Sequence, residues 1–129
     1  MKPQIQEFPT HNPSIGMIGD CMRAAIASIF ELPISSVPHI ASDYWPDIKA
    51  IDRAVINFVK DRGFLLNQFD YPKYSSHLAW QKENFGVDCY HLITGVDHDG
   101  EPHVCVGKNG KIIHDPHPLH RCFANPEDE

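Results

Sequence analysis

The stretch GDCMRAAIASIF, residues 19–30, decides how this chain should fold. It places Cys21 where a loop ends and where apolar residues begin to recur at the spacing of an amphipathic helix. Asp20 stands directly before that pattern, at the N-cap position, where short polar side chains are preferred. The following ELPISSVPH ends the helix, because proline lacks an N–H and clashes with the preceding turn. We therefore predict a helix that begins at Cys21 and ends before Pro33.

Other stretches predict the elements around this helix. Apolar residues at helical spacing from about Pro46 to Arg62 predict a second helix, with Gly63 as its C-terminal stop. FLLNQFD (64–70) predicts a strand, and residues 71–87 are polar, aromatic and irregular, as in surface loops. A three-stranded antiparallel meander is predicted from CYHLITGVD (89–97), EPHVCVG (101–107) and KIIHD (111–115). Helices followed by a sheet predict the α+β class.

Length and composition predict one domain. The chain has 129 residues, of which 42% are apolar and 22% charged, as in ordinary globular proteins. Residues 1–18 contain three prolines and little periodicity, so we expect an extended N-terminal segment. Residues 123–129 form an acidic tail.

Charge and hydropathy argue against two classes of partner. The formal net charge is −6 and no long basic cluster occurs, which argues against a nucleic-acid binder. No apolar run reaches the ~20 residues that span a bilayer, and the first residues lack the apolar core of a secretory signal. We therefore expect a cytoplasmic protein with neither nucleic-acid nor membrane partners, with no cofactor, and with an oligomeric state that the sequence leaves open. Its four cysteines are expected to be reduced: Cys21, Cys89, Cys105 and Cys122.

The position of Cys21 is that of an activated thiol. The thiolate is the reactive form of cysteine, and a helix N-terminus favours it through unpaired N–H groups and the helix dipole. The N–H of Cys21 would also face an oxyanion, and Gly19 leaves room for a substrate. Alternatively, Cys21 is a small buried apolar residue, because free cysteines are among the most buried residue types. A histidine within hydrogen-bond reach of the sulfur would favour the interpretation of Cys21 as a nucleophile over that of a buried apolar residue.

His103 and Asp115 lie on the two strands that flank KNG. If residues 109–110 form a two-residue turn, Val104 lies opposite Asp115. If residues 108–110 form a three-residue turn, His103 lies opposite Asp115 on the same face of the sheet. We predict the three-residue turn, because it forms a pair that can orient an imidazole toward a thiol.

The segments GDCMRAAIASIFELPISSVPH and HVCVGKNGKIIHDPHP, residues 19–39 and 103–118, resemble a family of small phage and bacterial proteins. That family carries a GDC–helix–LP–VPH segment and a C-terminal H-x-V-V-G-x-x-G-x-x-x-H-D-P-H-P segment. It is similar in turn to papain-like cysteine peptidases, notably those that process bacteriocin leaders. The resemblance implies one papain-like α+β domain over residues 1–129. In it, the nucleophile begins a central helix, and the N-terminal helices pack on a C-terminal antiparallel sheet.

The resemblance also assigns roles to single residues. Cys21 falls on the nucleophile, His103 on the general base and Asp115 on the acid that orients the imidazole. His117 falls on the second histidine of H-D-P-H-P, where we expect it to line the mouth of the site.

The oxyanion and substrate contacts are less directly assigned. Papain-like enzymes usually carry a glutamine a few residues before the cysteine, but the position six before it here holds Ile15. The nearby amides Gln6 and Asn12 are therefore the candidates for the second oxyanion donor. Asp20 and, in the loop of residues 71–87, Trp80 are the further candidates for substrate contact.

The expected function is hydrolysis of an amide in a peptide, an isopeptide or a small conjugate, through a thioester intermediate. One alternative is a papain-like module that binds a ligand without cleaving it. Another is a zinc protein, because nitrogen and sulfur ligands crowd the C-terminal third. Its candidate ligands are His103, Cys105, His114, His117, His120 and Cys122.

Overall fold

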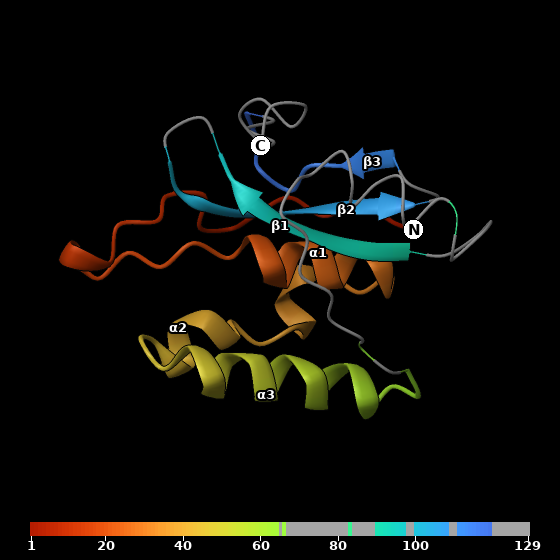
Figure 1. Cartoon of the computed structure of the whole chain (residues 1–129), viewed down its shortest axis with the longest axis horizontal. Coiled ribbons are helices and arrows are strands. Elements are labelled where there is room, and N and C mark those ends of the chain that lie inside the picture. The colour runs from red at the N-terminus through yellow and green to blue at the C-terminus, as the bar shows by residue number, and fades with distance from the viewer. Residues whose placement is uncertain (65, 67–82, 84–89, 98–99, 109–110, 120–129) are drawn as a thin grey trace.

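The computed structural model describes residues 1–64, 66, 83, 90–97, 100–108 and 111–119. These residues form three α-helices, two short 3-10 turns and a three-stranded antiparallel sheet of order β1-β2-β3 (Figure 1). The helices and turns are η1 (Pro13–Ile15), α1 (Cys21–Ile29), η2 (Ile34–Ser36), α2 (Ile40–Tyr44) and α3 (Ile48–Lys60). The strands are β1 (Tyr90–Val96), β2 (Pro102–Lys108) and β3 (Lys111–His114). Helices precede the sheet, which confirms the mixed α+β class.

Helix α1 lies between the sheet on one side and α2 and α3 on the other (Figure 1). Ala25 packs against Val104 and Val106 of β2. On the opposite side, Ile26 joins Val55 of α3 in a second apolar cluster. Four small side chains of α1 are fully buried, namely Ala24, Ala25, Ala27 and Ser28. Because these side chains are small, both layers can pack closely on the helix.

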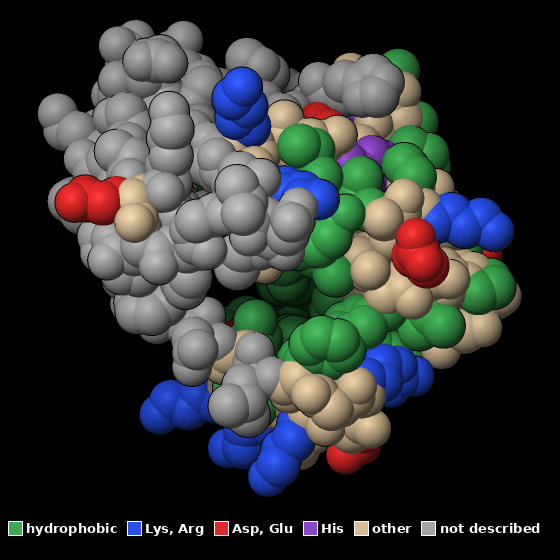
Figure 2. All heavy atoms as spheres, turned by 90° about the vertical axis from the view of Figure 1, so that its right-hand side faces the viewer, with side chains coloured by type: hydrophobic (Ala, Val, Ile, Leu, Met, Phe, Trp, Pro, Cys, Tyr) green, Lys and Arg blue, Asp and Glu red, His purple; other side chains and the backbone are tan. Residues whose placement is uncertain are grey.

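Half-buried apolar residues extend this core toward the surface. Phe30, Leu32 and Phe58 pack against the cluster that α1 forms with α2 and α3. On the face drawn in Figure 2, hydrophobic side chains of described residues gather in the middle, and Lys and Arg side chains lie along its lower edge. Apolar side chains thus reach the described surface on this side.

The predicted helices are present with modest differences. The first has the expected start, Cys21, and the second is α3, which is shorter than predicted by two residues at each end. Gly63 has a φ of 84°, the left-handed conformation expected of a helix stop. Helix α2 was not predicted, because its five residues are too few to show a helical period. The predicted strand 64–70, the loop 71–87 and the tail 123–129 lie outside the described residues, apart from Phe64, Leu66 and Glu83.

The three-residue turn predicted for the β2–β3 hairpin is wrong. The observed pairs are Lys108–Lys111, Gly107–Ile112 and, after a register shift, Val106–His114. The first two pairs have the register of a two-residue turn, which by itself would put Val104 opposite Asp115 and turn His103 to the other face. The register shift leaves Ile113 as an extra residue, as in a β-bulge, and returns Asp115 to the face of His103. The sequence therefore predicted that His103 and Asp115 share a face of the sheet, but it predicted the wrong register for the β2–β3 hairpin.

Residues 2–8 of the segment predicted to be extended form a strap along α1, whereas η1 and an isolated bridge between Asn12 and Met17 make a turn within residues 12–17. Lys2 and Gln4 donate their N–H groups to Ser28, to its carbonyl at 3.1 Å and its hydroxyl at 2.8 Å. The strap also binds the segment that follows β3, because the N–H of Gln6 donates to the carbonyl of Pro116 at 2.9 Å. The strap thus joins the central helix to the end of the sheet.

No single helix among the described residues is long and apolar enough to cross a membrane. By length and composition, only α1 taken together with Ile34–Tyr44 passes that test, and these two are bent by 102° relative to each other.

Loss of a central side chain should reveal how far the fold depends on α1. Ile26 is 2% exposed, so Ile26→Ala should lower the free energy of unfolding by about 2–5 kcal/mol. Ile56, on α3, is 40% exposed, so Ile56→Ala should change it by less than ~1 kcal/mol. Urea denaturation measures both values. Equal losses would contradict the central position of α1.

Candidate active site

A buried pair of titratable side chains connects the last two strands. His103 of β2 and Asp115, which directly follows β3, are 4% and 7% exposed. The imidazole Nε2 lies 2.7 Å from Oδ1 of Asp115. The same oxygen accepts the backbone N–H of His117 at 2.9 Å. The turn of the chain after β3 thereby holds the carboxylate of Asp115 against the imidazole of His103.

Electrostatics favour the charged form of both partners. Burial alone would lower the pKa of His103, but hydrogen bonds to Asp115 and Cys21 outweigh it and raise the pKa to about 10. Burial would raise the pKa of Asp115, but hydrogen bonds from His103 and the His117 N–H hold it below its usual value. The pair is therefore an imidazolium and a carboxylate at neutral pH.

Cys21 is the second side-chain partner of His103. It is the first residue of α1, it is half-buried, and its sulfur is a free thiol. Its hydrogen bond to His103 raises the pKa of that imidazole. The structure therefore brings together Cys21, His103 and Asp115, which the sequence placed in one site.

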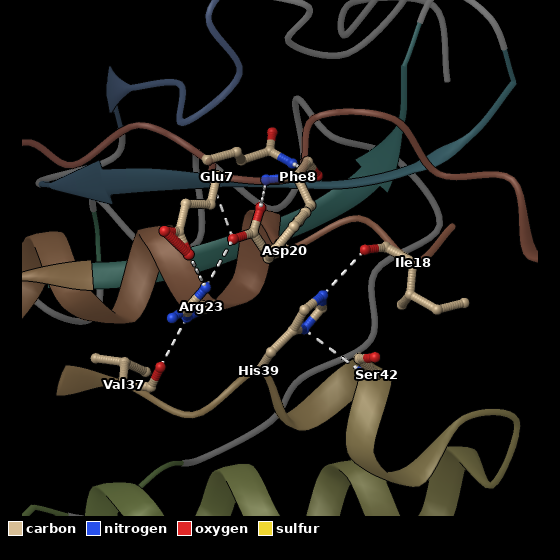
Figure 3. A network of polar contacts seen from close by, with 9 residues as sticks. Glu7, Phe8, Ile18, Asp20, Arg23, Val37, His39 and Ser42 are labelled. Atoms are coloured by element: carbon tan, nitrogen blue, oxygen red, sulfur yellow. Dashed lines mark hydrogen bonds and ion pairs between the residues drawn. The ribbon is translucent and has the colours of Figure 1, made fainter. Parts of the chain in front are cut away.

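Asp20 occupies the N-cap position of α1 but does not cap the helix, which corrects its predicted role. No side-chain cap hydrogen bond is formed at this end. Its carboxylate instead accepts the N–H groups of Glu7 at 3.2 Å and Phe8 at 2.9 Å (Figure 3). Nη1 of Arg23 lies 3.3 Å from the same carboxylate. The side chain of Asp20 therefore binds the strap, and no exposed part of it is left for a substrate.

Gln6 and Asn12, the two candidate oxyanion donors, have different surroundings. Gln6 is 8% exposed, and its N–H binds the carbonyl of Pro116, next to Asp115. Its Nε2 donates to the carbonyl of Phe8 at 3.2 Å, and its buried Oε1 has no partner among the described residues. Asn12 is exposed and accepts a hydrogen bond from Ser14 within its own turn. Of the two amides, Gln6 is therefore the one that is buried and bound to the segment that carries Asp115.

His117 lies beside the pair, as its place in H-D-P-H-P implied. Its ring centroid is 6.1 Å from that of His103, in an edge-on arrangement. Its Nδ1 accepts the N–H of Leu119 at 3.0 Å, which fixes the ring. The other expected substrate contact, Trp80, lies outside the described residues.

Part of the predicted zinc cluster also lies here. One donor atom each of His103, Cys105 and Asp115 lies within 4.8 Å of the others, and all three residues are buried. His114 is turned away, with its Nε2 2.7 Å from the carbonyl of Gln4. His120 and Cys122 lie outside the described residues. Among the described residues, a metal would therefore find three neighbouring side-chain donors.

Sequence reasoning missed Arg23 and Glu7. Nε of Arg23 donates to the carbonyl of Val37 at 2.7 Å, and Nη1 lies 2.7 Å from Oε1 of Glu7 (Figure 3). The available signal was a cation placed two residues after the cysteine on an otherwise apolar helix. Its partners could not be read from the sequence, because they come from segments that the fold brings together.

No protein-family model, curated protein or solved structure matches this chain.

Titration should reveal the charged pair. The His103 imidazole should stay protonated through neutral pH and titrate near the pKa of about 10, and Asp115→Asn should lower that pKa. In the unfolded chain the histidines should titrate near ~6.5, so NMR of imidazole C–H signals with and without urea measures the difference. Because the folded pKa is the higher one, the stability gained from the imidazolium is full below ~6.5 and is lost as pH rises through the folded value. A His103 that titrates near ~6.5 in the folded wild type would contradict the pair.

Proposed function

We propose that this chain is a papain-like cysteine hydrolase that cleaves an amide in a peptide, an isopeptide or a small conjugate. The observation that carries the proposal is the connected set of Cys21, His103 and Asp115. The thiol begins the helix packed against the sheet, His103 lies in β2, and Asp115 directly follows β3 of the same hairpin. That distribution of roles over elements is the one expected of the papain-like fold.

The first chemical step follows from the charges of the site. In the proposed reaction, the imidazole of His103 activates the thiol of Cys21, and the thiolate is the nucleophile. Sγ of Cys21 adds to the carbonyl carbon of the amide, and His103 then gives its proton to the leaving amine as the C–N bond breaks. A thioester remains, and a water molecule that gives a proton to His103 hydrolyses it. Asp115 keeps the imidazole oriented throughout.

The negative charge on the carbonyl oxygen needs donors during this addition. The first-turn N–H groups of α1 have no intrahelical partners, and Asp20 does not cap them. They point out of the helix beside Cys21, where the positive end of the helix dipole also lies. The buried carboxamide of Gln6 is our candidate for the second donor. Such donors are worth about 10²–10³ in rate each.

Reactivity of Cys21 tests this function. At about pH 6, iodoacetamide should alkylate Cys21 of the folded protein on the order of tenfold or more faster than the same residue in urea, because an ordinary thiol is mostly protonated there. His103→Ala should remove that advantage. Mass spectrometry of the modified peptide measures each rate.

Two outcomes would decide against a hydrolase. If Cys21 is protected, or reacts alike in the folded and unfolded chain, it is a core sulfur. If it reacts fast but His103→Ala changes nothing, the imidazole is not its base.

The oxyanion donor has its own test. The ester p-nitrophenyl acetate acylates a thiol through an oxyanion, whereas iodoacetamide alkylates it without one. Gln6→Ala should slow the acetylation of Cys21 by about 10²-fold and leave its alkylation nearly unchanged. Gln4→Ala is the matched control, two residues earlier on the same strap. Equal rates of acetylation in wild type and Gln6→Ala would exclude Gln6 as a donor.

A zinc site is the second candidate function, favoured by one observation. Oδ2 of Asp115 is buried and has no hydrogen-bond partner among the described residues. Together with His103 and Cys105 it could contribute to a site of nitrogen, sulfur and oxygen ligands, such as zinc accepts. Protein purified without a polyhistidine tag should then contain zinc in equal amount, and Cys105→Ala should lose it. Metal-free protein with a reactive Cys21 would exclude the zinc site and leave the hydrolase as the remaining function.

A further inference from the structure

Two aspartates stand at helix starts in this chain and behave differently. Asp47 caps α3, and its carboxylate accepts the N–H of Ala50 at 3.1 Å. Asp20 stands at the same position of α1, but its carboxylate accepts the N–H groups of Glu7 and Phe8. The first turn of α1 therefore lacks the side-chain acceptor that the first turn of α3 has. An ordinary cap is replaced here by a bond to the strap.

A buried cation holds the carboxylate of Asp20 in this position. None of the Asp20 side chain is exposed, and Arg23, one turn later, is 11% exposed. Arg23 contacts the carboxylates of Asp20 and Glu7, and it also donates to the carbonyl of Val37. Burying a carboxylate is costly unless it is paired and hydrogen-bonded, and Arg23 with the two strap N–H groups meets both needs. Figure 3 shows these contacts converging from the strap, from α1 and from the segment before α2.

The part of the strap held by Asp20 adjoins the candidate active site. Gln6 directly precedes Glu7 and Phe8, and its own N–H binds the carbonyl of Pro116 beside Asp115. Its side chain is bound at Nε2 by the carbonyl of Phe8, the residue that Asp20 fixes. Releasing the strap from Asp20 would therefore free the residue that holds the carboxamide of Gln6.

We propose that Asp20 and Arg23 are positioning residues for the oxyanion site. By binding the strap, Asp20 holds Gln6 beside the start of α1. Because its carboxylate forms no cap hydrogen bond with α1, the first-turn N–H groups stay available to a substrate oxygen. The inference rests on the proposed hydrolase function and assigns its oxyanion geometry to the Asp20–Arg23 ion pair, which lies next to the nucleophile in the chain.

Two reagents separate positioning from mere stability. With iodoacetamide, Sγ of Cys21 displaces iodide, and no charge develops on an oxygen. With p-nitrophenyl acetate, Sγ adds to the ester carbonyl, its oxygen becomes negative, and p-nitrophenolate leaves as the acetyl thioester forms. The ratio of acetylation to alkylation at Cys21 therefore reports on the oxyanion donors, and a loss of folded protein changes both rates together.

The variants are Asp20→Asn and Arg23→Lys, with Asp47→Asn as the matched control. Asparagine offers one carbonyl oxygen in place of two, so one strap N–H loses its acceptor and Arg23 loses one of its two carboxylate partners, keeping only Glu7. The ratio should fall roughly tenfold or more in Asp20→Asn, in the same direction but less in Arg23→Lys, and not in Asp47→Asn. Hydrogen exchange at the amides of Glu7 and Phe8 should become faster in Asp20→Asn while the amides within α1 stay protected. If Asp20→Asn does not fold, Arg23→Lys, which keeps the charge, gives the answer.

Each other outcome overturns a defined part of the account. If the ratio of acetylation to alkylation is unchanged in both variants while Cys21 of the wild type reacts fast, Asp20 and Arg23 are not positioning residues. The hydrolase function itself would still stand. An equal fall in Asp47→Asn overturns positioning too, because the effect is then one of stability. If Cys21 of the wild type reacts with both reagents like an ordinary thiol, the hydrolase function is wrong, and so is the positioning role that rests on it.

Discussion

The hydrogen bond between His103 Nε2 and Asp115 Oδ1 is the constraint on which the rest of the site depends. Two charged groups are out of water there, and such a pair is tolerated only with good geometry and further hydrogen bonds. The bulge in the β2–β3 hairpin supplies the geometry, since it turns both side chains to one face. The His117 N–H supplies the further bond. A single inserted residue, Ile113, thus decides whether the imidazole has a partner.

The second requirement is a fixed thiol, and helix α1 meets it by being buried on two sides. Its small residues pack against the sheet and against α3, so the helix has little freedom to move its first turn. The strap fastens both ends of this helix, at Ser28 and at Asp20. The strap at the beginning of the sequence and the sheet in its last third therefore both contact the helix that begins at Cys21.

The sequence predicted the parts of this arrangement that depend on local patterns. The start of α1, the extent of α3 and the three strands follow from periodicity and from proline and glycine positions. The pairing of His103 with Asp115 was predicted for the wrong reason, because nothing in KNG distinguishes a two-residue turn with a bulge from a three-residue turn. The role of Asp20 was missed because an N-cap position predicts a local hydrogen bond, whereas the N–H groups that donate to its carboxylate lie twelve and thirteen residues earlier. Contacts of that kind are set by tertiary packing.

The proposed hydrolase requires Cys21 to react as a thiolate beside the imidazolium of His103. The most direct measurement is the ultraviolet absorbance of the thiolate, taken as the difference between wild type and Cys21→Ala at about pH 6, where an ordinary thiol is protonated. The account predicts a thiolate signal of about one per chain that disappears in His103→Ala. A wild type without that signal, or one whose signal survives the loss of His103, would contradict it.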